Sequence, residues 1–225
     1  MLVKSVQELI DETLEPKEKR IRSGKFSPSS FGKCFRNQYW NRLNVEGEPI
    51  DSRTLRVFKA GNLFHDFVQG LLINETVKKE VLVESEDVKG FADLVNTEEV
   101  IDIKSQHSQS FWYRQKELKA SKDEAKSVKD MFFNNWLQVV YYATQLSKPF
   151  VRLVFISKDD LVIAEYRQEV NGYWTEQVNK ELSTLRQFWS EKKLPPASPR
   201  LYKQKDGSFK ECSYCQFKTK CKEEK

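Results

Sequence analysis

Three short segments rich in valine, isoleucine and phenylalanine constrain the fold of this chain most strongly. They cover residues 80–84, 90–96 and 100–104, and acidic residues at 86–87 and 98–99 fill the spaces between them. Short segments of this composition, joined by polar connections, are typical of β-strands. The pattern therefore predicts an antiparallel meander of three strands.

Helical periodicity flanks this meander on both sides, with apolar residues recurring every three or four positions. Helices are predicted over residues 5–15, after the capping signal Ser27-Pro28-Ser29-Ser30, over 52–77, over 110–145 with a break near Ser121, and over 174–191. A further strand pair is predicted at 151–156 and 161–166, with 158–160 as its turn. This order of elements predicts an α/β fold, with α+β as the alternative, in which helices flank a central mixed β-sheet.

The overall composition suits one globular domain. The chain has 225 residues, of which 39% are hydrophobic, and this is enough to bury a sizeable core. A net charge of +5 is compatible with a polyanion partner without being diagnostic. No apolar run reaches the roughly 18 residues of a membrane helix, and the first fifteen residues lack a signal-peptide core. We therefore expect a single domain over 1–225, located in the cytoplasm, with no membrane segment.

Two acidic residues and a lysine fall on the predicted meander. Asp102 and Lys104 are two positions apart, so they project from one face of a strand while Ile101 and Ile103 point into the core. A hairpin brings Asp93, on the preceding strand, opposite Asp102. Neighbouring carboxylates repel each other unless a cation neutralises them, and Mg²⁺ and Mn²⁺ prefer oxygen ligands. For Asp102 and Lys104 taken alone, the alternative is a solvated ion pair at a strand edge.

The four cysteines have an uneven distribution. Cys212, Cys215 and Cys221 are grouped near the C-terminus, whereas Cys34 lies near the N-terminus. Thiols of a cytoplasmic protein are expected to bind metal or to be reactive rather than to form a disulfide framework. Both a structural Zn²⁺ ion and a [4Fe–4S] cluster accept four thiolates, and the spacing does not choose between them.

Four motifs occur in a fixed order: Gly61-x-x-x-His65, Gly90-Phe91-Ala92-Asp93, Asp102-Ile103-Lys104, and Gln138-x-x-x-Tyr142. With this ordered set, the chain resembles the RecB-like branch of the PD-(D/E)XK nuclease superfamily over roughly residues 28–222. One departure is visible, since Ala92 occupies the place of the proline in the family's motif. Other RecB-like members also lack this proline.

The resemblance implies a restriction-endonuclease-like core and a role for each motif residue. Mg²⁺ or Mn²⁺ would be bound by His65, Asp93, Asp102 and the backbone carbonyl of Ile103. Lys104 takes the place of the family's catalytic lysine, and the two aspartates also belong to the catalytic set. Gln138 and Tyr142 would hold the environment of the lysine and the DNA strand.

The cysteine arrangement is similar to that of the iron–sulfur members of this branch, which include the CRISPR-associated RecB-type exonucleases and the nuclease domain of AddB. The resemblance implies that Cys34, Cys212, Cys215 and Cys221 ligate a structural [4Fe–4S] cluster. Residues 28–45 and 195–225 would then form a cluster lobe, and residues 52–192 the nuclease core.

The activity that the resemblance implies is metal-dependent hydrolysis of DNA, most typically by an exonuclease acting on single-stranded ends. One alternative is a DNA-binding or assembly component of a CRISPR adaptation complex or of a phage replication–recombination complex, with partner proteins and minor nuclease activity. Another is a structural protein stabilised by zinc. Trp112, Tyr113 and Arg114 are candidates for stacking on bases and contacting phosphates; the alternative for this segment is an amphipathic helix with its aromatic side in the core.

Overall fold

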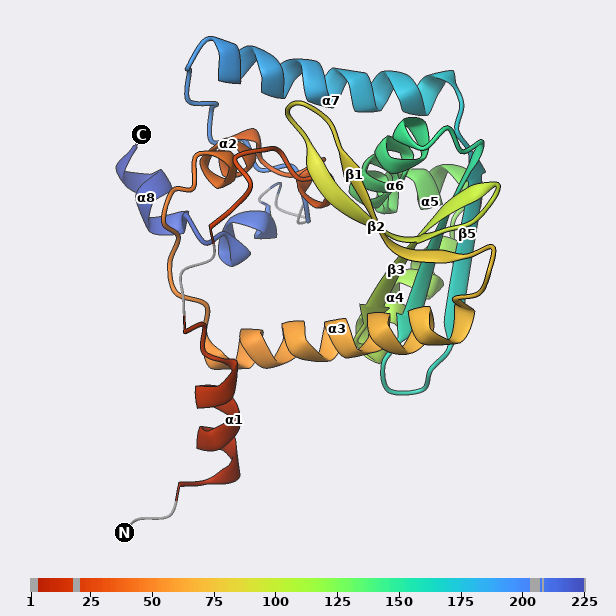
Figure 1. The fold of residues 1–225 in the computed structure, drawn as a ribbon, viewed down its shortest axis with the longest axis horizontal. Helices are drawn as coiled ribbons and strands as arrows, with labels where there is room; N and C mark the ends of the chain where they lie inside the picture. Colours follow the sequence, from red (N-terminus) through yellow and green to blue (C-terminus); the bar gives the residue numbers. More distant parts are fainter. Residues whose placement is uncertain (1–3, 18–20, 203–206, 208, 225) are drawn as a thin grey trace.

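The fold is built around a mixed sheet of five strands in the order β1-β2-β3-β4-β5 (Figure 1). The structure is a computed structural model that describes residues 4–17, 21–202, 207 and 209–224. The strands are β1 (Lys78–Glu84), β2 (Lys89–Val95), β3 (Glu99–Gln106), β4 (Phe150–Ser157) and β5 (Ile163–Glu169). Neighbouring strands are antiparallel except β3 and β4, which are parallel. A parallel pair needs a long crossover, and the helices between residues 106 and 150 provide it. The predicted α/β class and mixed sheet are confirmed.

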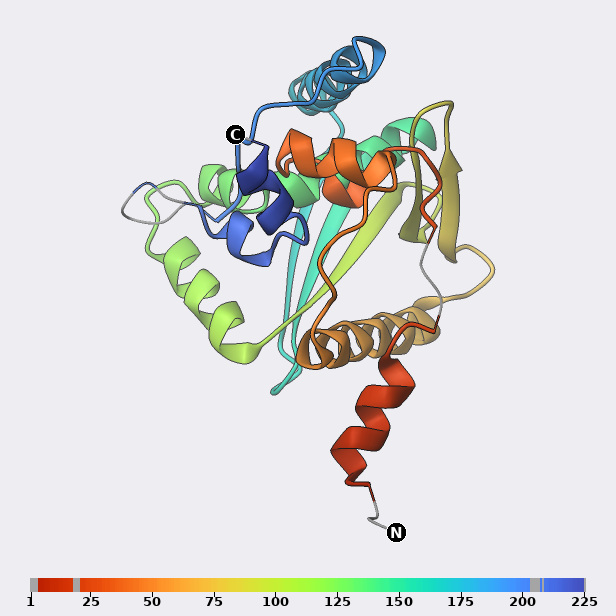
Figure 2. The ribbon, with the colours of Figure 1, turned by 90° about the vertical axis from the view of Figure 1, so that its left-hand side faces the viewer.

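Helices cover both faces of this sheet (Figure 2). They are α1 (Val6–Leu14), α2 (Phe35–Arg42), α3 (Ser52–Leu72), α4 (Ser108–Lys119), α5 (Glu124–Met131), α6 (Phe133–Gln145), α7 (Gly172–Ser190) and α8 (Lys218–Glu223), with short 3-10 helices η1 (Pro28–Ser30) and η2 (Lys210–Tyr214). Helix α1 projects away from the body of the protein (Figure 1). Within the part of the chain that the structure describes, no helix is both long and apolar enough to span a membrane.

Strand β3 is enclosed because a hydrophobic cluster lies on each face of the sheet. On one face, α6 packs between the sheet and α7, and residues 136–143 of α6 are all buried. On the other face, Ile103 packs with Phe64 and Val68 of α3. Polar side chains of β3 are therefore placed in the interior of the protein rather than at a solvated edge.

Two predicted helices have different ends in the structure. The segment after Ser27 forms only a 3-10 turn, and α2 begins at Phe35, because Gly32 adopts a φ of +78° that interrupts a helix. Helix α3 ends at Leu72 rather than near residue 77, because Oδ1 of Asn74 accepts hydrogen bonds from the backbone N–H groups of Thr76 and Val77. Such side-chain bonds compete with the helical ladder.

Three further predictions needed correction. The helix predicted to break near Ser121 does so, but a second break occurs at Phe132, where the backbone leaves the helical region. Residues 161–162 precede β5 rather than forming part of it. Glu99, which the sequence places in a turn, begins β3 and has 6% of its surface exposed. Its burial is balanced by ion pairs with Arg152 (3.1 Å) and Arg167 (2.9 Å).

Glu181 of α7 joins the N-terminal and C-terminal segments of the chain. It is 4% exposed and accepts hydrogen bonds from the backbone N–H of Gly32 (3.0 Å), from Nε2 of Gln38 (2.9 Å) and from Nη2 of Arg200 (2.7 Å). One carboxylate therefore fixes the position of the turn before α2 relative to the chain that follows α7.

Replacing Glu181 with alanine is expected to lower the free energy of unfolding by about 3 kcal/mol, because it leaves the Arg200 guanidinium without its buried partner. Urea unfolding followed by circular dichroism measures this loss. Glu176→Ala, on the exposed side of the same helix, is the matched control and should change stability by less than about 0.5 kcal/mol. Equal effects of the two substitutions would contradict the structural role of Glu181.

Candidate active site

Strand β3 places Asp102 and Lys104 on the same face of the sheet, as predicted from their spacing. Asp102 is 2% exposed, and its Oδ1 accepts a hydrogen bond from Nζ of Lys104 at 2.9 Å. Among the described residues, Oδ2 of Asp102 is buried without a hydrogen-bond partner. Because β3 is an inner strand, the alternative of a solvated pair at a strand edge is wrong for Asp102 and Lys104.

Asp93 and His65 join this pair from β2 and α3. Oδ2 of Asp93 accepts a hydrogen bond from the backbone N–H of Ile103 at 2.7 Å. Nδ1 of His65 lies 3.6 Å from the same oxygen atom. The structure thus brings together the imidazole, the two carboxyl groups and the lysine that the sequence motifs predict.

Burial shifts the protonation equilibria of these groups. It is the main reason why the pKa of Asp93 rises from 3.8 to about 7, and the negative charge of Asp102 adds to this rise. The pKa of His65 is lowered by burial and by the positive charge of Lys104. Burial also acts to lower the pKa of Lys104, but Asp102 and Asp93 outweigh it and the net shift is upward. At neutral pH, the lysine is charged and the imidazole is neutral.

The raised pKa of Asp93 makes the stability of the metal-free protein depend on pH. Since the folded state holds this proton up to about pH 7, stability falls as pH rises between about 4 and 7. Asp93→Asn removes this cost, and its stabilising effect should be larger at pH 8 than at pH 5 by on the order of 2 kcal/mol. Urea unfolding in EDTA at both pH values measures the difference, with the exposed Asp130→Asn as control. A gain that does not change with pH would contradict the assigned pKa.

Gln138 and Tyr142 lie on α6 and close the site from the side of the helix. Oε1 of Gln138 is 3.4 Å from Nζ of Lys104. A Cβ atom on Gly90 would come within 2.4 Å of the Tyr142 hydroxyl, so the tyrosine fits here because residue 90 is glycine. Burial, together with the charges of Asp102 and Asp93, raises the pKa of Tyr142, so its hydroxyl keeps its proton. The last two predicted motif residues therefore belong to the same site.

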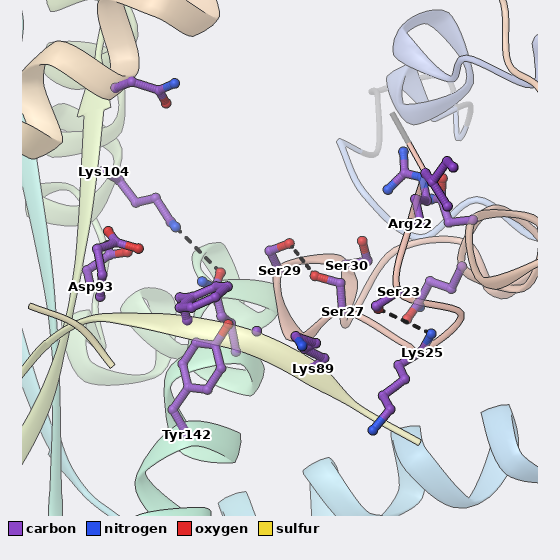
Figure 3. Close-up of a pocket in the computed structure, with 18 residues that line it drawn as sticks. Arg22, Ser23, Lys25, Ser27, Ser29, Ser30, Lys89, Asp93, Lys104 and Tyr142 are labelled. Atoms are coloured by element: carbon purple, nitrogen blue, oxygen red, sulfur yellow. Dashed lines mark hydrogen bonds between the residues drawn. The ribbon is translucent and has the colours of Figure 1, made fainter. Parts of the chain in front are cut away.

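A cavity of about 610 Å³ extends from these residues toward the N-terminal arm, residues 21–30 (Figure 3). At one end are Asp93, Lys104, Gln138 and Tyr142; the other end is lined by Arg22, Ser23, Lys25, Ser27, Ser29, Ser30 and Lys89. No sequence motif includes this arm, in which only the capping signal at residues 27–30 was predicted. Its alternation of basic and hydroxyl residues was the available signal.

The aromatic segment of α4 lies outside the residues that line this cavity. Phe111 and Leu118 anchor α4 in the core. Nε1 of Trp112 donates a hydrogen bond to Asp160 (2.7 Å), the guanidinium of Arg114 lies 5.9 Å from the ring centre of Phe132, and Tyr113 is 68% exposed. Contact of Trp112, Tyr113 and Arg114 with DNA stays a prediction.

The cysteines of the two chain ends approach each other between α2, η2 and α8. Cys34 immediately precedes α2. Burial raises the pKa of its thiol, and hydrogen bonds from the backbone N–H groups of Asn37, Arg36 and Ser198 partly offset this rise. Burial is the main cause of the raised pKa of the Cys212 thiol, and the charges of Cys215, Cys34 and Cys221 add to the rise. All four thiols are free, and the other three lie close enough to Cys212 to affect the pKa of its thiol.

Two of these sulfur atoms also have polar neighbours. Nδ2 of Asn37 lies 3.4 Å from Sγ of Cys215, and Nη1 of Arg36 lies 3.6 Å from Sγ of Cys221. Donors of this kind stabilise thiolates, the form that binds metal. The chemistry of the four sulfur atoms therefore fits either four-thiolate group, zinc or iron–sulfur.

In the described part of the chain, no group of three or more His, Cys, Asp or Glu side chains is already arranged to hold a metal ion. The donor types around Asp102 nevertheless fit a hard divalent cation. Carboxylate oxygens are its preferred ligands, and the buried Oδ2 of Asp102 lacks any other partner among the described residues.

Neither a protein-family model nor a curated protein matches the sequence. Among solved structures, SSO0001 superposes with a TM-score of 0.58 at 18% identity, covering 97% of this chain and 96% of that protein. LHK-Exo, an alkaline exonuclease from Laribacter hongkongensis solved in complex with dAMP, gives 0.49 at 13% identity, covering 83% and 94%. A phage-related exonuclease from Haemophilus somnus 129PT gives 0.43 at 15% identity, covering 83% and 97%. The likeness to SSO0001 shows a shared fold along nearly the whole length of both chains.

Proposed function

We propose that this protein is a DNA nuclease that depends on Mg²⁺ or Mn²⁺. The observation that carries the proposal is the buried carboxylate of Asp102, which has one oxygen paired to Lys104 and the other without a partner among the described residues. Asp93 lines the inner end of a cavity, and Nδ1 of His65 lies 3.6 Å from Oδ2 of Asp93. Carboxylates gathered around one ammonium form a site for a cation and for a phosphate group.

A divalent cation at Asp93, Asp102, His65 and the carbonyl of Ile103 would stabilise negative charge on a phosphate. Lys104 is held by Asp102 with its ammonium toward the cavity, where it can orient the attacking water and offset the charge that develops as the phosphodiester bond breaks. Gln138 keeps the ammonium in place from α6.

The cavity supports a single DNA strand as the substrate. Its outer end carries arginine, lysine and serine side chains, the residue types that contact phosphate oxygens. Phe91 also lines the cavity and is 48% exposed, which makes its ring available for stacking on an unpaired base. Together with the family resemblance, this favours exonuclease action on single-stranded ends.

From the resemblance of their spacing to the iron–sulfur members of the RecB-like branch, we propose that the four cysteines ligate a structural [4Fe–4S] cluster, with residues 28–45 and 195–225 as the cluster lobe and residues 52–192 as the nuclease core. The chemical supports are the mutual proximity of the thiols and the donors next to Cys215 and Cys221. The aromatic residues Tyr39, Trp40 and Phe217 pack against Cys215 and Cys221, which are partly buried.

A second candidate function is an assembly component of a larger DNA-processing complex, such as one for CRISPR adaptation, replication or recombination. The observation in its favour is α1, which buries none of its own residues and exposes Val6, Leu9 and Ile10. An amphipathic helix of this length gains stability mainly from packing against a partner.

A time course of cleavage tests the proposed activity. Single- and double-stranded DNA, labelled at one end and with each end either open or blocked, is incubated with Mg²⁺, with Mn²⁺ or with EDTA. We expect metal-dependent loss of the single strand with open ends and the release of short products. Absence of cleavage with every metal, together with retained DNA binding, would contradict the nuclease assignment and support the assembly role.

A further inference from the structure

Glu80 lies beside the candidate active site although it belongs to none of the sequence motifs. Its side chain lines the same cavity as Asp93 and Lys104. Its neighbours in β1 pair with the residues on either side of Asp93, so Glu80 faces Asp93 across the two strands. Its negative charge also contributes to the electrostatic environment of both Asp93 and His65.

A buried glutamine holds Glu80 in this position. Gln69 is 1% exposed, and its Nε2 donates hydrogen bonds to Oε1 of Glu80 (2.8 Å) and to the backbone carbonyl of Asp93 (3.1 Å). It lies one turn after His65 on α3, so the two side chains share a face of the helix. Gln69 therefore connects the helix that carries His65 with the two strands that carry Glu80 and Asp93.

The carboxyl groups at this centre outnumber the cationic side chains around them. Asp93 and Asp102 face one ammonium group, that of Lys104, and the negative charge of Glu80 acts on Asp93 as well. One buried oxygen of Asp102 has no hydrogen-bond partner in the described part of the chain, and a buried polar atom in this state is costly without a cation or a donor. Mg²⁺ takes six ligands in an octahedral arrangement, so the site can accept a further carboxylate in place of a water molecule.

We infer that Glu80 is a further carboxylate ligand of the divalent cation at this centre and that Gln69 is its positioning residue. The inference rests on the proposed function and extends it to two residues that no motif contains. The backbone of Glu80 has a φ of +48°, which is unfavourable for a residue other than glycine.

Titration of the purified protein with Mn²⁺, followed by electron paramagnetic resonance and calorimetry, tests this assignment without measuring cleavage. Glu80→Gln keeps the size of the side chain and an acceptor for Gln69, but removes the charge. We expect it to weaken Mn²⁺ binding about tenfold or more. Glu75→Gln removes one charge from the exposed loop between α3 and β1 and is the matched control; it should bind Mn²⁺ as the wild type does.

Gln69→Leu tests the positioning role. It should weaken Mn²⁺ binding less than Glu80→Gln does, and adding it to Glu80→Gln should cause little further loss, because both changes act on the same contact. Additive losses would overturn the role of Gln69.

Unchanged Mn²⁺ affinity in a folded Glu80→Gln variant would overturn the assignment of Glu80. If at the same time Asp102→Asn loses Mn²⁺, the proposed function stands and only Glu80 is excluded. Absence of Mn²⁺ binding by the wild type would instead refute the metal-dependent nuclease and, with it, the assignment of Glu80.

Discussion

A Lys104→Ala variant is expected to cleave single-stranded DNA at least about a thousandfold more slowly than the wild type in Mn²⁺. The ammonium group of Lys104 lies 2.9 Å from Asp102 and faces the cavity. Its removal takes away the positive charge that would offset the developing charge on the phosphate, an effect of about 10²–10³ in rate for one electrostatic donor, and also the group that orients water. End-labelled cleavage under single-turnover conditions measures the chemical step directly.

Folding of this variant has to be separated from catalysis. Because Lys104 stabilises the buried Asp102 carboxylate, the variant should also unfold at a lower temperature. The comparison is therefore made well below its melting temperature, with Lys126→Ala, an exposed lysine of α5, as the control that should cleave at the wild-type rate. A folded Lys104→Ala variant with undiminished cleavage would refute the proposed mechanism.

Replacing Cys215 with alanine is expected to remove the visible iron–sulfur absorbance of the purified protein and most of its iron. Metal binding of this kind is coupled to folding, and the cluster would join segments separated by most of the chain. The variant should therefore also lose several kcal/mol of stability, an amount comparable to the loss of a structural metal. Absorption spectra and iron and zinc analysis of anaerobically purified protein measure the first effect, and thermal unfolding measures the second.

Ser213→Ala, within the same short segment, is the control and should keep both colour and iron. Wild-type protein that contains zinc in place of iron would show that the four thiolates form a zinc site. Normal absorbance in Cys215→Ala would exclude this cysteine as a ligand.

Much of the site could be predicted from sequence because strand and helix periodicities are local properties. Alternation along β3 places Asp102 and Lys104 on one face whatever surrounds the strand. The four-residue spacing of Gln138 and Tyr142 places them on one face of α6 in the same way. The three strands of the meander and the existence of each main helix follow from patterns of this kind.

Other parts of the site depend on contacts that no local pattern contains. Glu80 reaches Asp93 through the pairing of β1 with β2 and through Gln69, a contact between separate elements. The arm at residues 21–30 lines the cavity because it lies beside the sheet, where Phe26 pairs with Val88. From its sequence neighbours, Glu99 resembles a turn residue. Its place in the sheet depends on hydrogen bonds from Arg152 and Arg167, which lie more than fifty positions later in the chain.

The parallel pairing of β3 with β4 has a consequence for the order in which the candidate active site can assemble during synthesis of the chain. The hairpin that carries Asp93, Asp102 and Lys104 is local and can form early. Gln138 and Tyr142 arrive only after the crossover has left the ribosome, and Arg200 reaches Glu181 later still. On the proposed function, a growing chain would therefore display its carboxylates before the helix that completes the site around Lys104 has formed.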